Sequence, residues 1–187
     1  ATSTTTRTAT ATPSQTPTPS ITPSPTSYPV IGIIPNLNRH PKDVRVEPST
    51  NRVWAPARDT NEVYIIDGAS LAILQQIAVG RAPFDVAIVP SRQRAYVTNF
   101  GSYNPPPFDG AHAPSLSVID TESLNIIREV AVGDEPHGVV VDPAGQRLFV
   151  LNTAQDCISV VRSDPGAETH QLSAGRGPWA AALSGDG

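Results

Sequence analysis

Three histidines stand beside prolines or in a proline-rich segment, where the composition predicts loops. His40 precedes Pro41, His137 follows Pro136, and His112 lies in the run GSYNPPPFDGAHAP. Imidazole nitrogens are common ligands of transition metals, so three histidines on one surface could form a metal site. The chain has no HxH or HxxxH spacing, however. We therefore expect these side chains to be solvated or bonded to loop backbone, with no metal bound.

Two aspartates have the types and places needed for acid–base chemistry. Asp43 and Asp85 each begin an alternating apolar run, DVRVEP and DVAIVP. Two carboxyl groups brought together can act as an acid and a base. Their equivalent places in two similar segments favour a structural alternative, in which each carboxylate accepts a hydrogen bond from a loop N–H group.

The segment 100–114 offers binding groups of other kinds. Tyr103 and Phe108 are loop aromatics that could stack on a sugar or on a peptide. Asn104, Asp109 and neighbouring carbonyls could hold a hard cation, but the DxDxDG pattern of calcium loops is absent. The chain also lacks a CxxCH haem motif, a GxSxG elbow and a phosphate loop. It therefore contains no complete catalytic constellation.

These residues are positioned by a repeat that four prolines mark. The first and third intervals between consecutive anchor prolines are equal, and the second interval is longer. Each anchor is followed by an alternating run (DVRVEP, DVAIVP, GVVVDP and, last, AAALSG), which predicts a strand. Three further runs follow in register in each of the first three repeats. The second runs are VWAPA, AYVTN and LFVLN, the third runs are VYIID, LSVID and ISVVR, and the fourth runs are ILQQIAVG, IIREVAVG and ETHQLSAG. Four short strands in each repeat of roughly 40 residues predict the blades of a β-propeller. The anchors are Pro41, Pro83, Pro136 and Pro178.

Polar residues recur at the ends of these strands. Asp67 and Asp120 follow the third strand of their repeats and are expected to form Asx turns. An arginine begins each second strand, and salt bridges within turns or between blades are favoured there over an anion site. These arginines are Arg52, Arg94 and Arg147.

The second repeat is longer than the first and third, and the whole excess lies between Asn99 and Ser115. We expect a decorated loop there, between the second and third strands of the blade, because insertions are tolerated in loops. The predicted blades are residues 38–80, 81–133 with the insertion 100–114, 134–175, and the start of a fourth at 176–187.

The string AYVTN, with VID and AVG at their spacings, resembles the YVTN family of seven-bladed β-propellers. The phrases GDEPHGVVVDPAGQRLFVLN and LSVIDTESLNIIREVAVG look like this repeat nearly throughout, and the resemblance covers residues 38–187. Departures are VWAPA in the first repeat and VVR in the third. The resemblance implies an all-β propeller fold. It does not imply one activity, since relatives occur in surface-layer proteins, periplasmic binding proteins and proteins similar to quinoprotein or amine dehydrogenase subunits.

Three repeats and the start of a fourth cannot close a seven-bladed ring. We therefore expect the chain to be part of a longer protein, with the remaining blades as its intramolecular partner. The run PVIGIIPNL precedes the first repeat in the register of a fourth strand, and it could complete the last blade.

In propellers, the loops that lead into each first strand share one face with the loops between second and third strands, around the mouth of the central channel. We expect a protein or carbohydrate ligand at this mouth, where strands from all blades converge. No cofactor is expected. The candidate binding residues on this face are His40, Arg81, Tyr103, Phe108, His112, Glu135, His137 and Arg176.

The segment before the repeats has a different composition. Residues 1–29 include 11 Thr, 5 Ser and 6 Pro, with Arg7 as the only charge. Such a segment has little apolar surface to bury, so we expect a disordered and extended linker or stalk. O-glycosylation of this stalk is an open alternative.

Charge and cysteine content exclude several classes of function. The net charge is −4, and no run of five basic residues occurs, so binding to nucleic acid or to anionic lipid is not expected. The single cysteine, Cys157, lies in an apolar strand and is expected to be buried and inert. No apolar stretch approaches the length of roughly 18 residues that a membrane-spanning helix needs, so no membrane insertion is expected in this segment.

The favoured interpretation is a non-enzymatic propeller that is secreted, periplasmic or on the cell surface and that binds a partner through its loop-bearing face. The alternative is the propeller subunit of an enzyme, either quinoprotein- or amine-dehydrogenase-like or lactonase-like, whose catalytic residues lie in blades outside this sequence. Fold alone does not decide between them.

Overall fold

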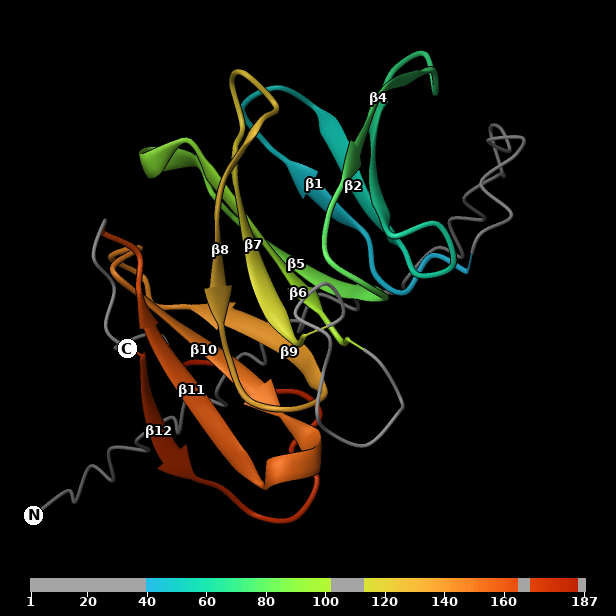
Figure 1. Ribbon diagram of the computed structural model, residues 1–187. Helices are drawn as coiled ribbons and strands as arrows, with labels where there is room; N and C mark the ends of the chain where they lie inside the picture. Colours follow the sequence, from blue (N-terminus) through green and yellow to red (C-terminus); the bar gives the residue numbers. More distant parts are fainter. Residues whose placement is uncertain (1–39, 102–112, 165–168, 185–187) are drawn as a thin grey trace, which may run out of the picture. The chain divides into compact units, whose positions relative to one another are not determined.

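The computed structural model describes residues 40–101, 113–164 and 169–184 (Figure 1). The chain divides into two units, residues 1–31 and 32–187, and every described residue belongs to the second. The predicted linker at 1–29, the run PVIGIIPNL and most of the insertion 100–114 lie outside the described residues.

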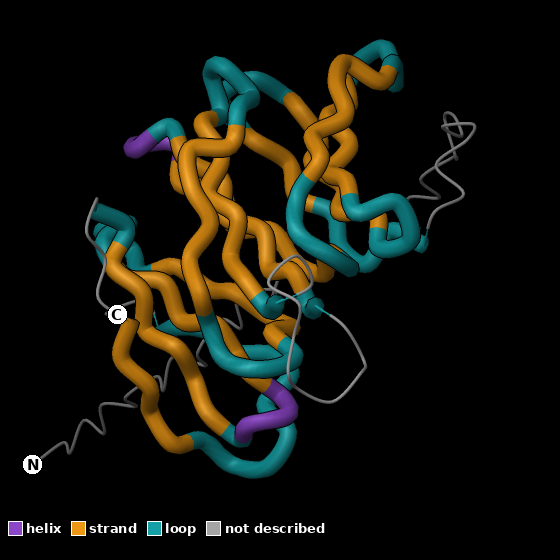
Figure 2. Tube along the Cα trace, in the orientation of Figure 1, coloured by secondary structure: helices purple, strands orange, loops and turns teal. Residues whose placement is uncertain are grey.

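The described residues form three four-stranded antiparallel sheets in which consecutive strands pair, as predicted for propeller blades (Figures 1 and 2). Besides these strands they contain only two short 3₁₀ turns, at Pro90–Arg92 and Thr153–Gln155. The first sheet has β1 (Arg45–Glu47), β2 (Arg52–Ala57), β3 (Glu62–Asp67) and β4 (Ile73–Ala78). The second has β5 (Pro83–Val89), β6 (Arg94–Asn99), β7 (Ser115–Asp120) and β8 (Ile126–Ala131). The third has β9 (Pro136–Val141), β10 (Arg147–Asn152), β11 (Cys157–Arg162) and β12 (Thr169–Ser173).

The turns between the third and fourth strands confirm the predicted Asx geometry. The Asp67 carboxylate accepts hydrogen bonds from the backbone N–H groups of Ala69 and Ser70 at 3.0 and 2.6 Å. Asp120 does the same for Glu122 and Ser123 at 3.1 and 2.8 Å. These bonds lower the pKa of both carboxyl groups, because they stabilise the charged form.

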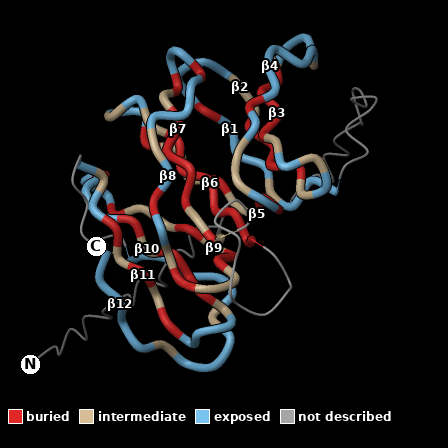
Figure 3. The backbone as a smooth tube through the Cα atoms, in the orientation of Figure 1, coloured by how far each residue is buried: buried red, intermediate tan, exposed pale blue. Residues whose placement is uncertain are grey.

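Apolar side chains fill the spaces between neighbouring sheets, while the outermost strands are largely exposed (Figure 3). The aromatic position of the second strand packs toward the next sheet. Trp54 of β2 lies in a core with residues of β5, β6 and β7, and Tyr96 of β6 lies in a core with residues of β9, β10 and β11. Both side chains are fully buried. The equivalent Phe149 of β10 is only half-buried.

The second and third sheets each contact the end of the previous sheet through an asparagine and a glycine. A Cβ atom added to Gly80, after β4, would lie 2.6 Å from Nδ2 of Asn99, at the end of β6. A Cβ atom added to Gly133, after β8, would lie 2.7 Å from Nδ2 of Asn152, at the end of β10. The glycine that ends the fourth run of one repeat therefore contacts the asparagine that ends the second run of the next repeat. The glycine leaves the space that the asparagine fills.

The segment after β12 differs from the prediction. AAALSG has the pattern of a strand, but residues 178–184 carry no strand and pair with none of the described strands. A strand is stabilised by its ladder, and the described residues provide no second strand for this segment to pair with. It still lies against β9, since a Cβ atom added to Gly138 would be 2.9 Å from the Trp179 carbonyl oxygen.

Within the described residues, no helix has the length and apolar character needed to cross a membrane.

Candidate functional site

The loops that lead into the first strands and the loops after the second strands meet on one face, as expected. The N–H of Gly101 donates to the carbonyl oxygen of Arg81 at 3.0 Å. The N–H of Thr153 donates to the carbonyl oxygen of Glu135 at 3.1 Å in the next repeat. These backbone bonds fix the entry of β5 and β9, where the anchor prolines stand.

The residue after each anchor proline points toward this face, and three of the four are rings that gather together. The His137 ring lies 4.4 Å from Phe84 and 3.9 Å from Trp179, measured between centroids. Phe84 and Trp179 lie edge to face at 5.6 Å, and Phe100 contributes a further edge to His137 at 5.2 Å. The fourth equivalent residue, Lys42, places its Nζ atom 5.8 Å from the Phe84 centroid.

His137 is held by hydrogen bonds in the centre of this aromatic group. Its Nδ1 atom lies 2.7 Å from Oγ1 of Thr153 and 3.1 Å from the Glu135 carbonyl oxygen. Because the Thr153 hydroxyl donates to the Pro178 carbonyl oxygen at 2.7 Å, its oxygen is free to accept, and Nδ1 carries the proton. Burial lowers the pKa of His137, so the ring is neutral at physiological pH.

Threonine hydroxyls join the innermost segments of three successive repeats. The N–H of Asp85 donates to Oγ1 of Thr98 at 3.0 Å, and this hydroxyl donates to the His137 carbonyl oxygen at 2.7 Å. Thr153 makes the corresponding bond from His137 to Pro178. Thr98 lies near the end of β6 and Thr153 begins the 3₁₀ turn after β10, so side chains at the ends of the second strands help to position the aromatic group.

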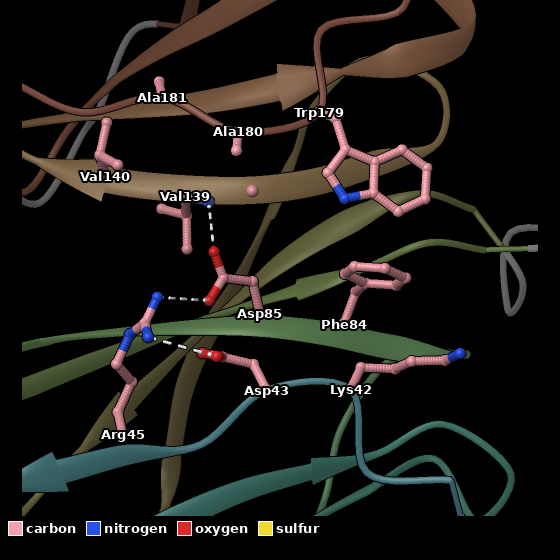
Figure 4. A pocket seen from close by; sticks show the side chains of 11 residues that line it. Lys42, Asp43, Arg45, Phe84, Asp85, Val139, Val140, Trp179, Ala180 and Ala181 are labelled. Atoms are coloured by element: carbon pink, nitrogen blue, oxygen red, sulfur yellow. Dashed lines mark hydrogen bonds and ion pairs between the residues drawn. The ribbon is translucent and has the colours of Figure 1, made fainter.

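Two carboxylates and one guanidinium group form the other end of the site (Figure 4). Arg45 pairs with Asp43 at 3.2 Å and with Asp85 at 3.3 Å. The Asp85 carboxylate also accepts the N–H of Val86 at 2.8 Å and, across to the next sheet, the N–H of Val139 at 2.9 Å. These contacts connect the first strands of three repeats.

The Asp85 carboxyl group is buried beside that of Asp43, and this changes its ionisation. Burial raises the pKa of Asp85 to about 7, and the hydrogen bond and charge repulsion of Asp43 add to the rise. The buried Oδ2 atom of Asp43 has no hydrogen-bond partner among the described residues. A proton held by Asp85 would supply that partner. Asp85 can therefore hold a proton near neutral pH.

The aromatic and ionic ends enclose one pocket of about 230 Å³ (Figure 4). Its wall is formed by Lys42, Asp43 and Arg45, by Phe84 and Asp85, by β9 and by residues 179–181. Gly138 allows the Trp179 backbone to approach β9 closely, since any larger residue would push it away. Charged groups, hydrogen-bonding groups and rings thus converge where four repeats meet, as in many small-ligand sites.

The predicted site residues are only partly brought together. Glu135 and His137 belong to the aromatic end through the Glu135 carbonyl. His40 pairs with Asp59 at 2.5 Å, and it does not line the pocket. Arg81 and Arg176 are exposed beside the mouth. Tyr103, Phe108 and His112 lie outside the described residues.

Among the residues that the structure describes, no group of three or more histidine, cysteine, aspartate or glutamate side chains could hold a metal ion. Cys157 is buried, as predicted. Arg147 forms the predicted salt bridge within a turn, with Asp142 at 3.1 Å, whereas Arg94 pairs with Asp120 at 2.6 Å across two strands of its own blade. Arg52 instead donates to a backbone carbonyl of the next repeat, that of Thr121, at 2.7 Å.

Sequence reasoning weighed Asp43 and Asp85 but missed Phe84, Trp179 and Arg45. The signal for the aromatic residues was present, because both occupy the position after an anchor proline, where Lys42 and His137 also stand. For Asp85 the structural role was predicted correctly in kind. Its partners are N–H groups of strands, one of them in the neighbouring sheet, in place of a loop N–H.

No protein-family model and no curated protein matches the chain. Solved structures do, and they are propeller proteins. Hydrazine synthase of Kuenenia stuttgartiensis superimposes with a TM-score of 0.63 at 22% identity, over 75% of this chain and 38% of that chain. A putative 6-phosphogluconolactonase from Bacteroides fragilis gives 0.60 at 12% identity, over 74% and 40%. The β-propeller domain of Myceliophteria thermophila Cps50 (Swd1) gives 0.57 at 12% identity, over 71% and 39%.

These likenesses, together with the three four-stranded sheets, show an all-β propeller fold. At these sequence identities the likenesses support the fold and not a function. The chain spans about two fifths of the length of each of these three structures.

Proposed function

We propose that this chain is a binding module that takes its ligand at the loop-bearing face of the propeller, in the pocket between Arg45 and Trp179. The observation that carries this proposal is the convergence of equivalent positions from four repeats on one small pocket with an aromatic and an ionic end. Binding sites combine apolar walls with a few fixed polar groups in the same way.

We further infer that the repeats are of the YVTN type. The contacts of Gly80 with Asn99 and of Gly133 with Asn152 support this, because they give the closing residues of two repeat motifs one physical role. We also propose that further blades of the same protein complete the ring, and that the propeller is displayed outside the cell on the Thr/Ser/Pro-rich segment 1–29. Protection of the segment from added protease on intact cells would contradict the proposed exposure.

The experiment is a thermal-shift screen of the chain against soluble glycans, peptides and small organic acids. A ligand that binds only the folded state raises the melting temperature. Ligands of this site should lose their effect in Trp179→Ala and keep it in Leu74→Ala, which removes a comparably exposed apolar side chain from β4. Ligands that act equally on both variants would place binding elsewhere and refute the proposal.

One observation favours a second candidate, an enzymatic propeller. A carboxyl group with a pKa of about 7 can accept a proton at neutral pH, as a general base must. Structural neighbours include a protein described as a putative 6-phosphogluconolactonase. Turnover of a small ester or lactone that Asp85→Asn abolishes would favour this candidate over the binding module.

A further inference from the structure

The groups that a ligand meets in this pocket are not the groups that lie deepest in it. The Asp85 and Asp43 side chains are only 13% and 22% exposed, whereas the Arg45 side chain is 50% exposed. Trp179 is 58% exposed, and Lys42 is exposed at the rim. The side of the pocket that faces solvent therefore presents two cations and an aromatic ring, with the carboxylates behind them.

We propose that the pocket binds a small six-membered ring that carries a carboxylate, with Arg45 receiving the carboxylate, Trp179 packing on the ring and Lys42 adding positive charge at the aromatic rim. This inference rests on the proposed binding function and names its ligand chemistry. Such a ring is either an acidic sugar or an aromatic acid. Both present a flat face and an anionic group, as the two ends of the pocket require.

The guanidinium group of Arg45 has N–H groups to spare for a ligand. It uses Nη1 and Nη2 toward Asp43 and Asp85 at 3.2 and 3.3 Å, which are long for charge-assisted hydrogen bonds. A guanidinium group has five N–H donors in a planar fork that matches a carboxylate. A ligand carboxylate can therefore bind without breaking the contacts that hold Arg45 in place.

Trp179 is supported as a platform for a ring. Its indole packs against His137 at 3.9 Å with a 32° tilt, and the edge of Phe84 lies beside it at 5.6 Å. His137 is fixed in turn by Thr153. The volume of about 230 Å³ is below the range of roughly 300–1,000 Å³ that drug-sized ligands occupy. A single ring fits this pocket better than a long peptide does.

Protonation should control this binding. The charged groups that face the pocket are Lys42, Asp43 and Arg45 from the first repeat and Asp85 from β5. The described segment 179–181 and the β9 residues of the wall, Gly138–Val140, add no charged side chain, and burial lowers the pKa of His137 at the aromatic end, which favours its neutral form. The four charges sum to zero when Asp85 is ionised and to +1 when it is protonated. A carboxylate ligand therefore binds the protonated form better.

The size of this effect follows from linkage. With the pKa of Asp85 at about 7, about ten molecules in eleven are protonated at pH 6 and about one in eleven at pH 8. If the carboxylate ligand binds only the protonated form, its affinity falls about tenfold between these pH values.

The two tryptophans of the chain provide the assay. Trp54 is fully buried in the core, so a change in the emission of exposed tryptophan reports Trp179. The full chain is titrated with glucuronate, glucose and benzoate at pH 6 and pH 8. We expect glucuronate or benzoate to bind and to bind about tenfold more weakly at pH 8. Glucose, which lacks the carboxylate, should bind at least about tenfold more weakly than glucuronate, from the loss of a charge-assisted hydrogen bond.

Substitutions separate the roles of the pocket residues. Asp85→Asn should retain at pH 8 the affinity that the natural chain shows at pH 6, because its side chain carries no charge at either pH. Arg45→Gln and Lys42→Gln should each reduce carboxylate binding. Arg162→Gln, on the exposed end of β11, removes the same charge outside the pocket and should leave binding unchanged. A circular dichroism spectrum matching that of the natural chain shows that each variant is folded.

The outcomes are distinct. Binding of glucuronate alone identifies an acidic sugar, and binding of benzoate alone identifies an aromatic acid. Equal binding of glucose and glucuronate, or unchanged affinity in Arg45→Gln, overturns the inference. If neither acid binds while another ligand from the screen still depends on Trp179, the ligand class is wrong and the proposed function stands. If no ligand depends on Trp179, both are wrong.

Discussion

Replacing Gly80 by alanine should destabilise the fold, because the added methyl group has no room. Its Cβ atom would lie 2.6, 2.7 and 2.8 Å from the Nδ2, Cγ and Cβ atoms of Asn99. Real Cβ atoms essentially never approach other atoms below 3.0 Å, so something must shift. Rotating χ1 of Asn99 cannot relieve the contact, since its own Cβ atom is among the three.

The cost has two parts. Overpacking a core position costs about 1–3 kcal/mol. Moving Asn99 also disturbs its bonds to Ser115 and Ser117 at 2.9 and 2.7 Å, and a buried donor that loses its partner costs about 1–3 kcal/mol. The smaller entropy of the unfolded alanine chain returns about 0.4–1 kcal/mol. The net destabilisation is about 2–4 kcal/mol, or roughly 5–15 °C in melting temperature for a domain of this size.

Gly175 supplies the matched control. It occupies the same place in the third repeat, but a Cβ atom added there has nothing within 4 Å. Gly175→Ala should therefore leave the melting temperature unchanged or raise it slightly. The assay is thermal unfolding followed by circular dichroism. Equal melting temperatures for Gly80→Ala and Gly175→Ala would refute the reasoning, as would strictly additive effects of Gly80→Ala and Asn99→Ala in the double variant.

Two further predictions concern the innermost strands. Asp85 has a pKa of about 7 in the folded chain, against about 3.9 unfolded, so stability falls as pH rises through 7. Asp85→Asn should remove about 1–4 kcal/mol of this fall, measured as the free energy of unfolding at pH 5 and at pH 8. The lowered pKa of His137 gives the opposite pH dependence, but it is the same in both proteins and cancels when they are compared. An equal change in the free energy of unfolding between pH 5 and pH 8 for the two proteins would contradict this. Thr98→Val should lower the free energy of unfolding by about 2–3 kcal/mol, because the buried hydroxyl accepts from the Asp85 N–H and donates to the His137 carbonyl. Thr169→Val, on the exposed strand β12, is the control. Equal denaturation midpoints for the two variants would contradict this role of Thr98.

The blades were predictable because their information is local and repeated. A two-residue alternation sets each strand, and Asp67 and Asp120 close their turns by bonding to residues two and three positions later. Such contacts can be read from one stretch of sequence. Their recurrence in register from one repeat to the next then excludes other arrangements of the same strands.

The site was less predictable because its contacts join different repeats. The ring of Trp179 meets that of His137, one full repeat earlier in the chain, only because successive sheets bring their first strands together. The repeat register does place Phe84, His137 and Trp179 at one position. The register cannot say that these side chains turn toward one another. That depends on Thr153, which binds the His137 ring and the Pro178 carbonyl.

The first repeat departs from AYVTN at the position where the next two repeats have the asparagine that contacts the preceding sheet. Ala57 stands at the same interval after Pro41 at which Asn99 and Asn152 follow their own anchors. Three positions before Pro41 the chain has Asn38, whereas Gly80 and Gly133 hold that place in the next two repeats. In the sequence of the first repeat, the large and the small residue of these two positions are thus exchanged. VWAPA nevertheless forms the second strand of a complete four-stranded sheet, so its loss of asparagine does not weaken the assignment of residues 40–80 to a propeller blade.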